Sequence, residues 1–289
     1  MTFAGCSDFL QEDVRGQENL DTYFQTEEEA ESFLTGCYSA LTYGGWWQIN
    51  KLWLLSEMCS DDCWMGNTAQ DQGDYISVAH YQGNGQSNEA IANFWQYRYK
   101  GILRCNIAIE RIPEASILDK EKQSRLVAEA RFLRAFYYFY LTALWDNVPL
   151  VLNTSSAADK PMQASADEVL IQIEEDLEDA ITKLPSTRDA NNYGRPTKGA
   201  AYGLLAKAYA QHHKWEDAKR CLEWLVDGEG KNYYTLVPNW ADNFSNYTED
   251  NKESLYEIHF SLTNKVGFDQ TDNYPVSYTH LTLPTILRV

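Results

Sequence analysis

Residues 119 to 145 constrain the fold more than any other part of the sequence. Apolar side chains recur there at helical spacing from Leu126 onward, and the second half of the segment is apolar on nearly every side. A helix that is apolar all round is stable only inside a protein, because none of its faces is suited to water. The segment therefore predicts a buried central helix from about Asp119 to Trp145, around which other elements must pack.

Five more segments show the same helical periodicity. Each has at least one boundary signal. At the start this is an N-capping residue, acidic residues in the first turn or a preceding proline, and at the end it is a proline. The predicted helices run over about 26–41, 89–112, 165–184, 197–209 and 215–225. The alanine-rich helix ending at Tyr209, a short polar turn and then Trp215 before Ala218 form the pattern of a tetratricopeptide-like helical hairpin. A second such hairpin is expected between the helix ending at Trp145 and the one starting at Ser165.

The predicted fold class is all-α, a tetratricopeptide-like helical-repeat scaffold with long aromatic-rich loops and little strand. The longest loop is predicted from Trp46 to Asn88, where aromatic side chains are scattered among Gly, Asn, Gln and Asp. Residues 148–152 predict a short extended link, and the alternation from Glu253 to Phe260 predicts one strand.

Charge and hydropathy limit the partners. The chain has 24 Lys and Arg against 42 Asp and Glu, a net charge of −18, which repels phosphate backbones. Nucleic acid is therefore not an expected partner. The sequence has no uncharged apolar stretch approaching the roughly 18 residues that span a bilayer, so any link to a membrane must be an anchor.

Catalytic and cofactor motifs are absent from the sequence. It has no Gly-rich phosphate loop, G-x-S-x-G elbow or H-E-x-x-H helix, and its five histidines form no triad or metal-ligand spacing. We expect no enzyme activity, no cofactor and no metal. Cys59 with Cys63 lacks the second pair of a zinc site, and the loop carboxylates from Asp61 to Asp74 fit a solvated acidic loop better than a calcium site. Arg125, Arg131 and Arg134 are expected to pair with acidic residues.

Aromatic side chains in the long loop carry the better functional hypothesis. Sugar rings stack their C–H faces on Trp and Tyr, while amides and carboxylates bind their hydroxyls. The loop holds both kinds of group, and the candidate glycan-binding residues are Trp64, Tyr75, Tyr81, Asn67, Gln70 and Asp74. The alternative for each aromatic residue is that it anchors its loop to the scaffold.

The two ends of the sequence differ from the rest. Phe3 to Cys6 reads as an apolar residue, two small residues and a cysteine, the pattern that precedes lipidation of the cysteine in bacterial lipoproteins. We expect residues 1–22 to be a lipoprotein leader with a clipped signal peptide, lipidated at Cys6. Residues 276–285 read VSYTHLTLPT, which resembles the translation of a DNA sequencing adapter, so residues 276–289 are expected to be non-native.

Several motifs in order resemble the SusD/RagB lipoproteins. The strongest are Ala128–Ala135, which reads AEARFLRA, then Val148–Leu150, which reads VPL, and Gly194–Ala201, which reads GRPTKGAA. The resemblance extends over about residues 5–262 and corresponds to the N-terminal half of that family, so 23–275 is expected to be an incomplete SusD-like N-terminal helical domain.

The resemblance implies a surface-exposed, lipid-anchored protein of the outer membrane of Bacteroidota. Such proteins capture oligosaccharide or polysaccharide and deliver it to a SusC-type TonB-dependent transporter, without being enzymes. Among the motifs, FLRA and GRPTKGAA look structural. Two alternatives remain open: a helical-repeat adaptor that binds protein and uses its aromatic residues as core, and a glycoside hydrolase using loop carboxylates such as Asp61 and Asp74.

Overall fold

The computed structural model describes residues 23–42, 52–63, 73–82, 88–115, 118–154, 160–189, 192–245, 247–249 and 251–258. Its long helices are α1 (Glu27–Thr42), α4 (Glu89–Arg111), α5 (Lys120–Trp145), α6 (Ala166–Lys183), α7 (Lys198–Gln211) and α8 (Trp215–Val226). The shorter elements are α2 (Leu52–Ser56), α3 (Gly73–Ala79), three 3-10 turns, η2 (Ile112–Glu114), η4 (Glu229–Asn232) and η5 (Trp240–Phe244), and the strands β1 (Val148–Pro149) and β2 (Gln163–Ala164).

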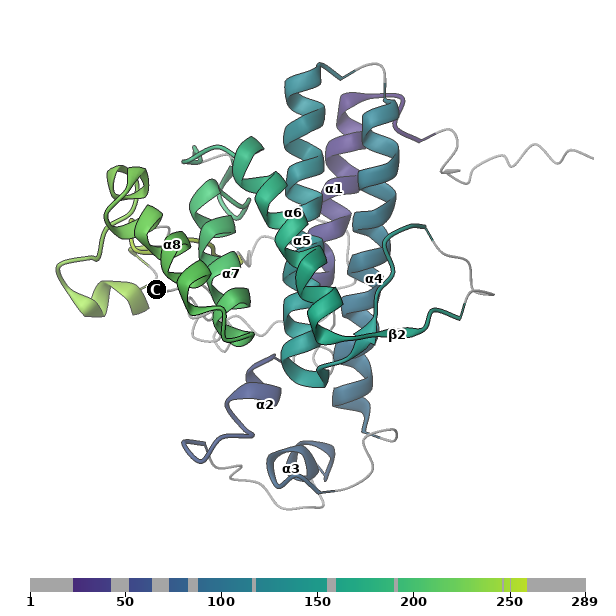
Figure 1. Cartoon of the computed structure of the whole chain (residues 1–289), viewed down its shortest axis with the longest axis vertical. Helices are drawn as coiled ribbons and strands as arrows, with labels where there is room; N and C mark the ends of the chain where they lie inside the picture. The colour runs from purple at the N-terminus through teal and green to yellow at the C-terminus, as the bar shows by residue number, and fades with distance from the viewer. Residues whose placement is uncertain are drawn as a thin grey trace, which may run out of the picture.

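The long helices contact one another in chain order. Helices α1, α4 and α5 stand together along the long axis of the molecule, and α6, α7 and α8 follow in turn beside α5 (Figure 1). Each helix from α4 to α8 packs on the next, as in helical-repeat proteins. The predicted all-α, tetratricopeptide-like architecture is confirmed. Strand pairing in the described residues is limited to β1 with β2, antiparallel with Val148 opposite Ala164.

Local sequence signals set the helix boundaries. The Asp119 carboxylate accepts the Lys122 N–H at 2.7 Å and so caps α5. At the start of α6, Ser165 Oγ accepts the Glu168 N–H at 3.3 Å while the Glu168 carboxylate accepts the Ser165 N–H at 2.8 Å. This is a capping box, which satisfies backbone donors that a helix start otherwise leaves unpaired.

Helix α5 forms the centre of the core, as its composition predicts. Phe132, Phe136 and Tyr137 are fully buried. The Tyr137 hydroxyl donates to the Cys37 carbonyl at 2.6 Å and thereby joins α5 to α1. A Cβ atom at Gly101 of α4 would lie 2.5 Å from the Tyr137 ring, so the close approach of α4 to α5 requires glycine there.

Two sequence predictions are wrong. The stretch from Trp46 to Asn88 is not irregular throughout, because α2 and α3 form within it. Residues 253–258 form no strand; adjacent Leu255 and Tyr256 are both buried, which an alternating strand with one buried face does not allow. Tyr256 instead packs edge-on against Phe132, with ring centroids 5.2 Å apart. In the described part of the chain, no helix is long and apolar enough to cross a membrane.

Candidate functional site

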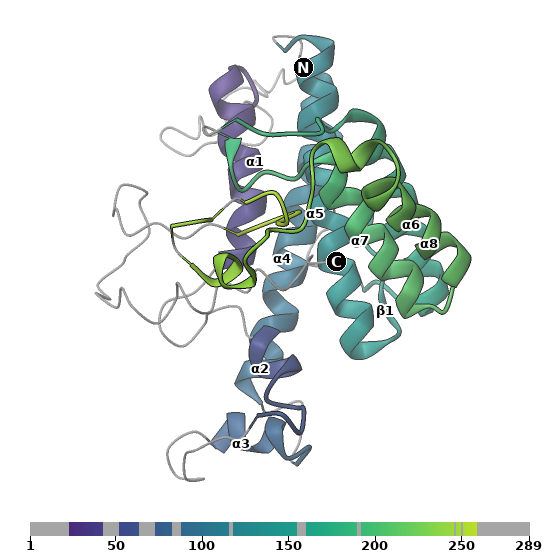
Figure 2. The same ribbon diagram turned by 90° about the vertical axis from the view of Figure 1, so that its left-hand side faces the viewer.

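The predicted glycan-binding loop includes α2 and α3, which lie at one end of the long helices (Figures 1 and 2). Met58, Val78 and Ala90 bury their side chains together in a cluster separate from the main core. Leu55 and Tyr75 pack against this cluster. Helix α3 is therefore held against the start of α4 by its own small apolar contact.

Tyr81 presents the most accessible ring of the candidate residues in the described part of the loop. It follows α3 in the left-handed backbone region, with φ of 53°, and is 80% exposed. Its hydroxyl donates to the Cys59 carbonyl at 2.6 Å and so ties the end of α3 to the turn after α2. The hydroxyl bond fixes the ring position while leaving the ring in solvent, as a stacking platform requires.

Asp74 and Tyr75 have structural contacts that the sequence did not reveal. The Asp74 carboxylate accepts the Glu89 N–H at 3.0 Å, and its carbonyl accepts the Asn88 amide at 2.8 Å. These bonds place the negative charge of Asp74 at the positive N-terminus of α4. Burial, together with the nearby Glu89 and Asp74 carboxylates, raises the pKa of the partly buried Tyr75. Tyr75 therefore anchors α3 more than it offers a face to a ligand.

Asp74 and Tyr75 lie in the first turn of α3, and Tyr81 follows the end of that helix. Trp64, Asn67, Gln70 and the predicted lipidation site Cys6 lie outside the described residues. The described part of the loop thus offers one fixed, exposed aromatic ring after a helix whose Asp74 carboxylate already caps α4. Such a surface can stack on the apolar face of a sugar.

Charged residues of the AEARFLRA and GRPTKGAA motifs, Glu129 and Arg195, belong to one ion network. Glu129 is fully buried and is contacted by Arg188 at 3.2 Å and Arg195 at 3.1 Å. The Tyr38 hydroxyl also donates to Glu129, at 2.8 Å. Burial and the Glu129 carboxylate raise the pKa of Tyr38 well above its ordinary value, so it remains a donor. These contacts satisfy a carboxylate that would be very costly to bury alone.

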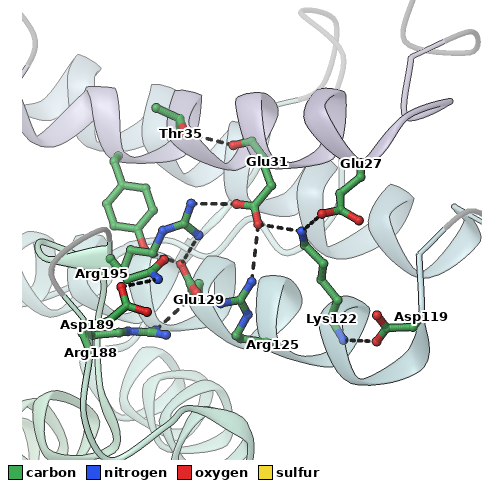
Figure 3. Close-up of polar contacts among 12 residues, drawn as sticks. Glu27, Glu31, Thr35, Asp119, Lys122, Arg125, Glu129, Arg188, Asp189 and Arg195 are labelled. Atoms are coloured by element: carbon green, nitrogen blue, oxygen red, sulfur yellow. Dashed lines mark hydrogen bonds and ion pairs between the residues drawn. The ribbon is translucent and has the colours of Figure 1, made fainter.

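Glu31 of α1 extends this network to the protein surface. Figure 3 shows its carboxylate between Arg195 and the two cations of α5, Lys122 and Arg125. The N···O distances to Arg195, Lys122 and Arg125 are 2.6, 3.2 and 3.4 Å. Arg195 precedes α7, while Lys122 and Arg125 belong to α5. The network therefore joins three separate parts of the chain, and the arginines of the GRPTKGAA and nearby segments serve the scaffold.

Arg134 of the FLRA segment forms a second buried pair. Its guanidinium donates two bonds to Asp176 of α6, at 2.8 and 2.7 Å, and one to Asn106 of α4 at 2.9 Å. Burial raises the pKa of Asp176, and Arg134 opposes that rise. As predicted, Arg125, Arg131 and Arg134 all pair with acidic side chains.

Metal ligands do not gather in the part of the chain that the structure describes, where no group of three His, Cys, Asp or Glu side chains is placed to hold an ion. His212 lies 3.6 Å from the Asp167 carboxylate, a surface pair at the end of α7. The buried cysteines 37, 105 and 221 occupy helix faces in the core, as predicted.

The decisive comparison is a family model that matches residues 8–210 and is described as starch-binding, associating with the outer membrane. The chain belongs to the SusD-like family. Curated relatives include a SusD-like protein of Formosa agariphila, 25% identical over 278 residues, which are 92% of this chain and 51% of that protein. The starch-binding protein SusD of Bacteroides thetaiotaomicron is 24% identical over 209 residues, 70% of this chain and 36% of that protein. The chain spans about half the length of the first of these relatives.

Solved SusD-like structures share the fold. A SusD superfamily protein from Bacteroides vulgatus superposes with a TM-score of 0.73 at 26% identity, covering 82% of this chain and 50% of that one. Surface glycan-binding protein A from Bacteroides thetaiotaomicron, solved with laminarihexaose, gives 0.71 at 25% identity, covering 81% and 50%. The family is thus one of outer-membrane-associated carbohydrate-binding proteins.

The structure exposes further aromatic rings in this SusD-like chain that sequence reasoning did not assign to a site. Trp240, Phe244 and Tyr247 lie in and after η5 and face solvent. The available signal was their position among Asn and Asp, the same mixture that marked the loop before α4.

Proposed function

We propose that the chain is part of a cell-surface, lipid-anchored glycan-binding protein that captures oligosaccharide and delivers it to a SusC-type TonB-dependent transporter. The observation that carries the glycan-binding role is the exposed ring of Tyr81, fixed by its hydroxyl bond on a starch-binding family scaffold. Trp64, Asn67 and Gln70 supply the remaining stacking and hydroxyl-binding groups of this site, and Asp74 positions α3. The protein binds its glycan without cleaving it.

The proposed protein has three segments. Residues 1–22 form a leader lipidated at Cys6, residues 23–275 form the helical glycan-binding domain, and residues 276–289 are not native. The acyl chains on Cys6 provide the membrane link. Mass spectrometry of protein expressed with a lipoprotein signal tests this, since a lipid adduct is expected on the wild type and is absent from Cys6→Ala.

The test of glycan binding is isothermal titration calorimetry of the chain with laminarihexaose and maltoheptaose. Tyr81→Ala removes the exposed ring, and truncating an aromatic anchor is expected to weaken binding by at least about tenfold. Tyr193→Ala is the matched control, because Tyr193 is also exposed, at 50%, but lies before α7. Equal affinity of wild type and Tyr81→Ala would exclude this ring from the site.

The competing role is a protein-binding adaptor, and measurable affinity for glycan separates the two roles. Co-purification with a SusC-type transporter and glycan binding together support the proposed function. Protein binding without measurable affinity for any glycan would favour the adaptor. Release of shortened sugars from either probe would contradict a purely binding role.

A further inference from the structure

A second aromatic surface lies in the segment after α8. Trp240, Phe244 and Tyr247 are 73%, 58% and 92% exposed. The Trp240 and Phe244 rings contact each other, with centroids 4.5 Å apart and planes inclined by 54°. Leu236, 71% exposed, precedes them. Two rings that touch each other and still face water form a continuous aromatic surface, whereas isolated exposed apolar residues need no explanation.

Hydrogen bonds of neighbouring polar residues hold this segment in place. The Asn239 side chain caps η5, accepting the Ala241 N–H at 3.3 Å and donating to the Asp242 carboxylate at 2.9 Å. The Asn251 amide donates to the buried Asn243 at 3.2 Å, and the Thr248 hydroxyl donates to the Asp242 carbonyl. The backbone that carries the rings is therefore held before any ligand arrives, which removes part of the entropy cost of binding.

The groups around the rings define the ligand chemistry. Asn239 and Asp242 border Trp240. Beyond the bond that joins them, the Asn239 amide has a second N–H and the Asp242 carboxylate a second oxygen to offer to sugar hydroxyls. Glu249 adds a further negative charge to the segment, and the whole chain carries −18. A ligand with apolar faces and many hydroxyls fits this combination, while carboxylated sugars and anionic lipids are repelled.

We propose that Trp240, Phe244 and Tyr247 form a second glycan subsite, selective for uncharged pyranose oligomers. In Figure 2 the segment after α8 lies apart from α3, which is at the lower end of the long helices; since Tyr81 follows α3 in the chain, the two sites are distinct. The inference rests on the proposed glycan-binding function and adds residues to it. Two separated platforms on one scaffold bind a long chain more tightly than either alone.

The test is calorimetric titration of the chain with laminarihexaose, maltoheptaose, cellohexaose and mannohexaose, and with a polygalacturonate oligomer as the acidic probe. Trp240→Ala is expected to weaken binding of a neutral oligomer at least about tenfold, and Trp240→Phe, which keeps an aromatic face, is expected to retain most of it. The matched control is Trp215→Ala at the start of α8, where a tryptophan is 61% exposed but contacts His213 instead. Far-UV circular dichroism checks that each variant keeps its helices.

The outcomes separate this subsite from the general function. Wild-type affinity in Trp240→Ala, with weaker binding in Tyr81→Ala, would overturn the subsite and leave glycan binding at α3 intact. No binding of any probe by the wild type would overturn both. Tighter binding of polygalacturonate than of neutral oligomers would overturn the selectivity. If sedimentation shows that the wild type self-associates and that Trp240→Ala does not, at unchanged sugar affinity, the surface is a protein contact and the proposal is overturned.

Discussion

The Arg134–Asp176 pair provides the sharpest test of how the scaffold is stabilised. The two side chains are 6% and 0% exposed, and they are joined by two hydrogen bonds. We compare three variants: Asp176→Leu, Arg134→Met, and the two combined. Each single substitution removes one charge and leaves its partner in the interior.

The expected magnitudes follow from these contacts. Removing one partner of a buried ion pair costs about 3–5 kcal/mol, because the other charge stays buried and unpaired. The double variant buries no charge at this position. It still leaves the Asn106 side-chain oxygen without the N–H that Arg134 donates at 2.9 Å, which costs about 1–3 kcal/mol. The double variant should therefore be more stable than Asp176→Leu alone, despite carrying one more substitution.

Urea unfolding followed by far-UV circular dichroism measures this difference. The slope of the free energy with urea must be similar among the variants, so that the same surface is exposed on unfolding. A destabilisation of the double variant equal to the sum of the two single costs would mean that the side chains do not interact. That result would refute the ion-pair reasoning.

Three further predictions concern charge and packing. Burial raises the pKa of Glu31, but Arg195 and Lys122 outweigh burial and hold that pKa below its usual 4.5. The ionised carboxylate therefore stabilises the fold above pH 4.5, and this stability is lost as the pH falls through the lowered pKa. In urea unfolding at a series of pH values, Glu31→Gln should lose less stability than the wild type as the solution is made acidic. Gly101→Ala, whose Cβ would lie 2.5 Å from a buried tyrosine ring, should destabilise by about 1–3 kcal/mol in urea unfolding. Gly36→Ala, with nothing within 4 Å, should instead stabilise by about 0.5–1 kcal/mol.

The long helices could be predicted because their determinants are local. Capping residues such as Asp119 and Ser165 lie within three positions of the backbone groups that they bind. Apolar periodicity over 12 residues or more then identifies the buried face. The AEARFLRA, VPL and GRPTKGAA motifs occur in the same order as in the SusD/RagB family, and this order allowed the family to be predicted from the sequence.

The short elements could not be predicted, because contacts between distant residues determine them. Helices α2 and α3 have 5 and 7 residues, too few for a periodic pattern. They are stabilised by Met58, Val78 and Ala90, which meet only after folding. In the candidate site, the same contacts decide that Tyr75 is partly buried while Tyr81 is exposed. Two tyrosines in similar sequence surroundings therefore have different roles.

The long connection between α1 and α4 can vary with little loss of stability, because the two helices that it joins contact each other directly. Helices α1 and α4 contact directly, and Arg104 of α4 donates to the Gly36 carbonyl of α1 at 2.9 Å. The entropy cost of closing the connection between them grows only with the logarithm of its length. Residues can therefore be added or exchanged in this connection at little cost to the core, while the buried charges of Glu129 and Arg134 cannot vary independently of their partners. Solved relatives at about 25% identity accordingly share the helical fold, and we expect the loops that the helices carry, rather than the helices themselves, to set glycan selectivity.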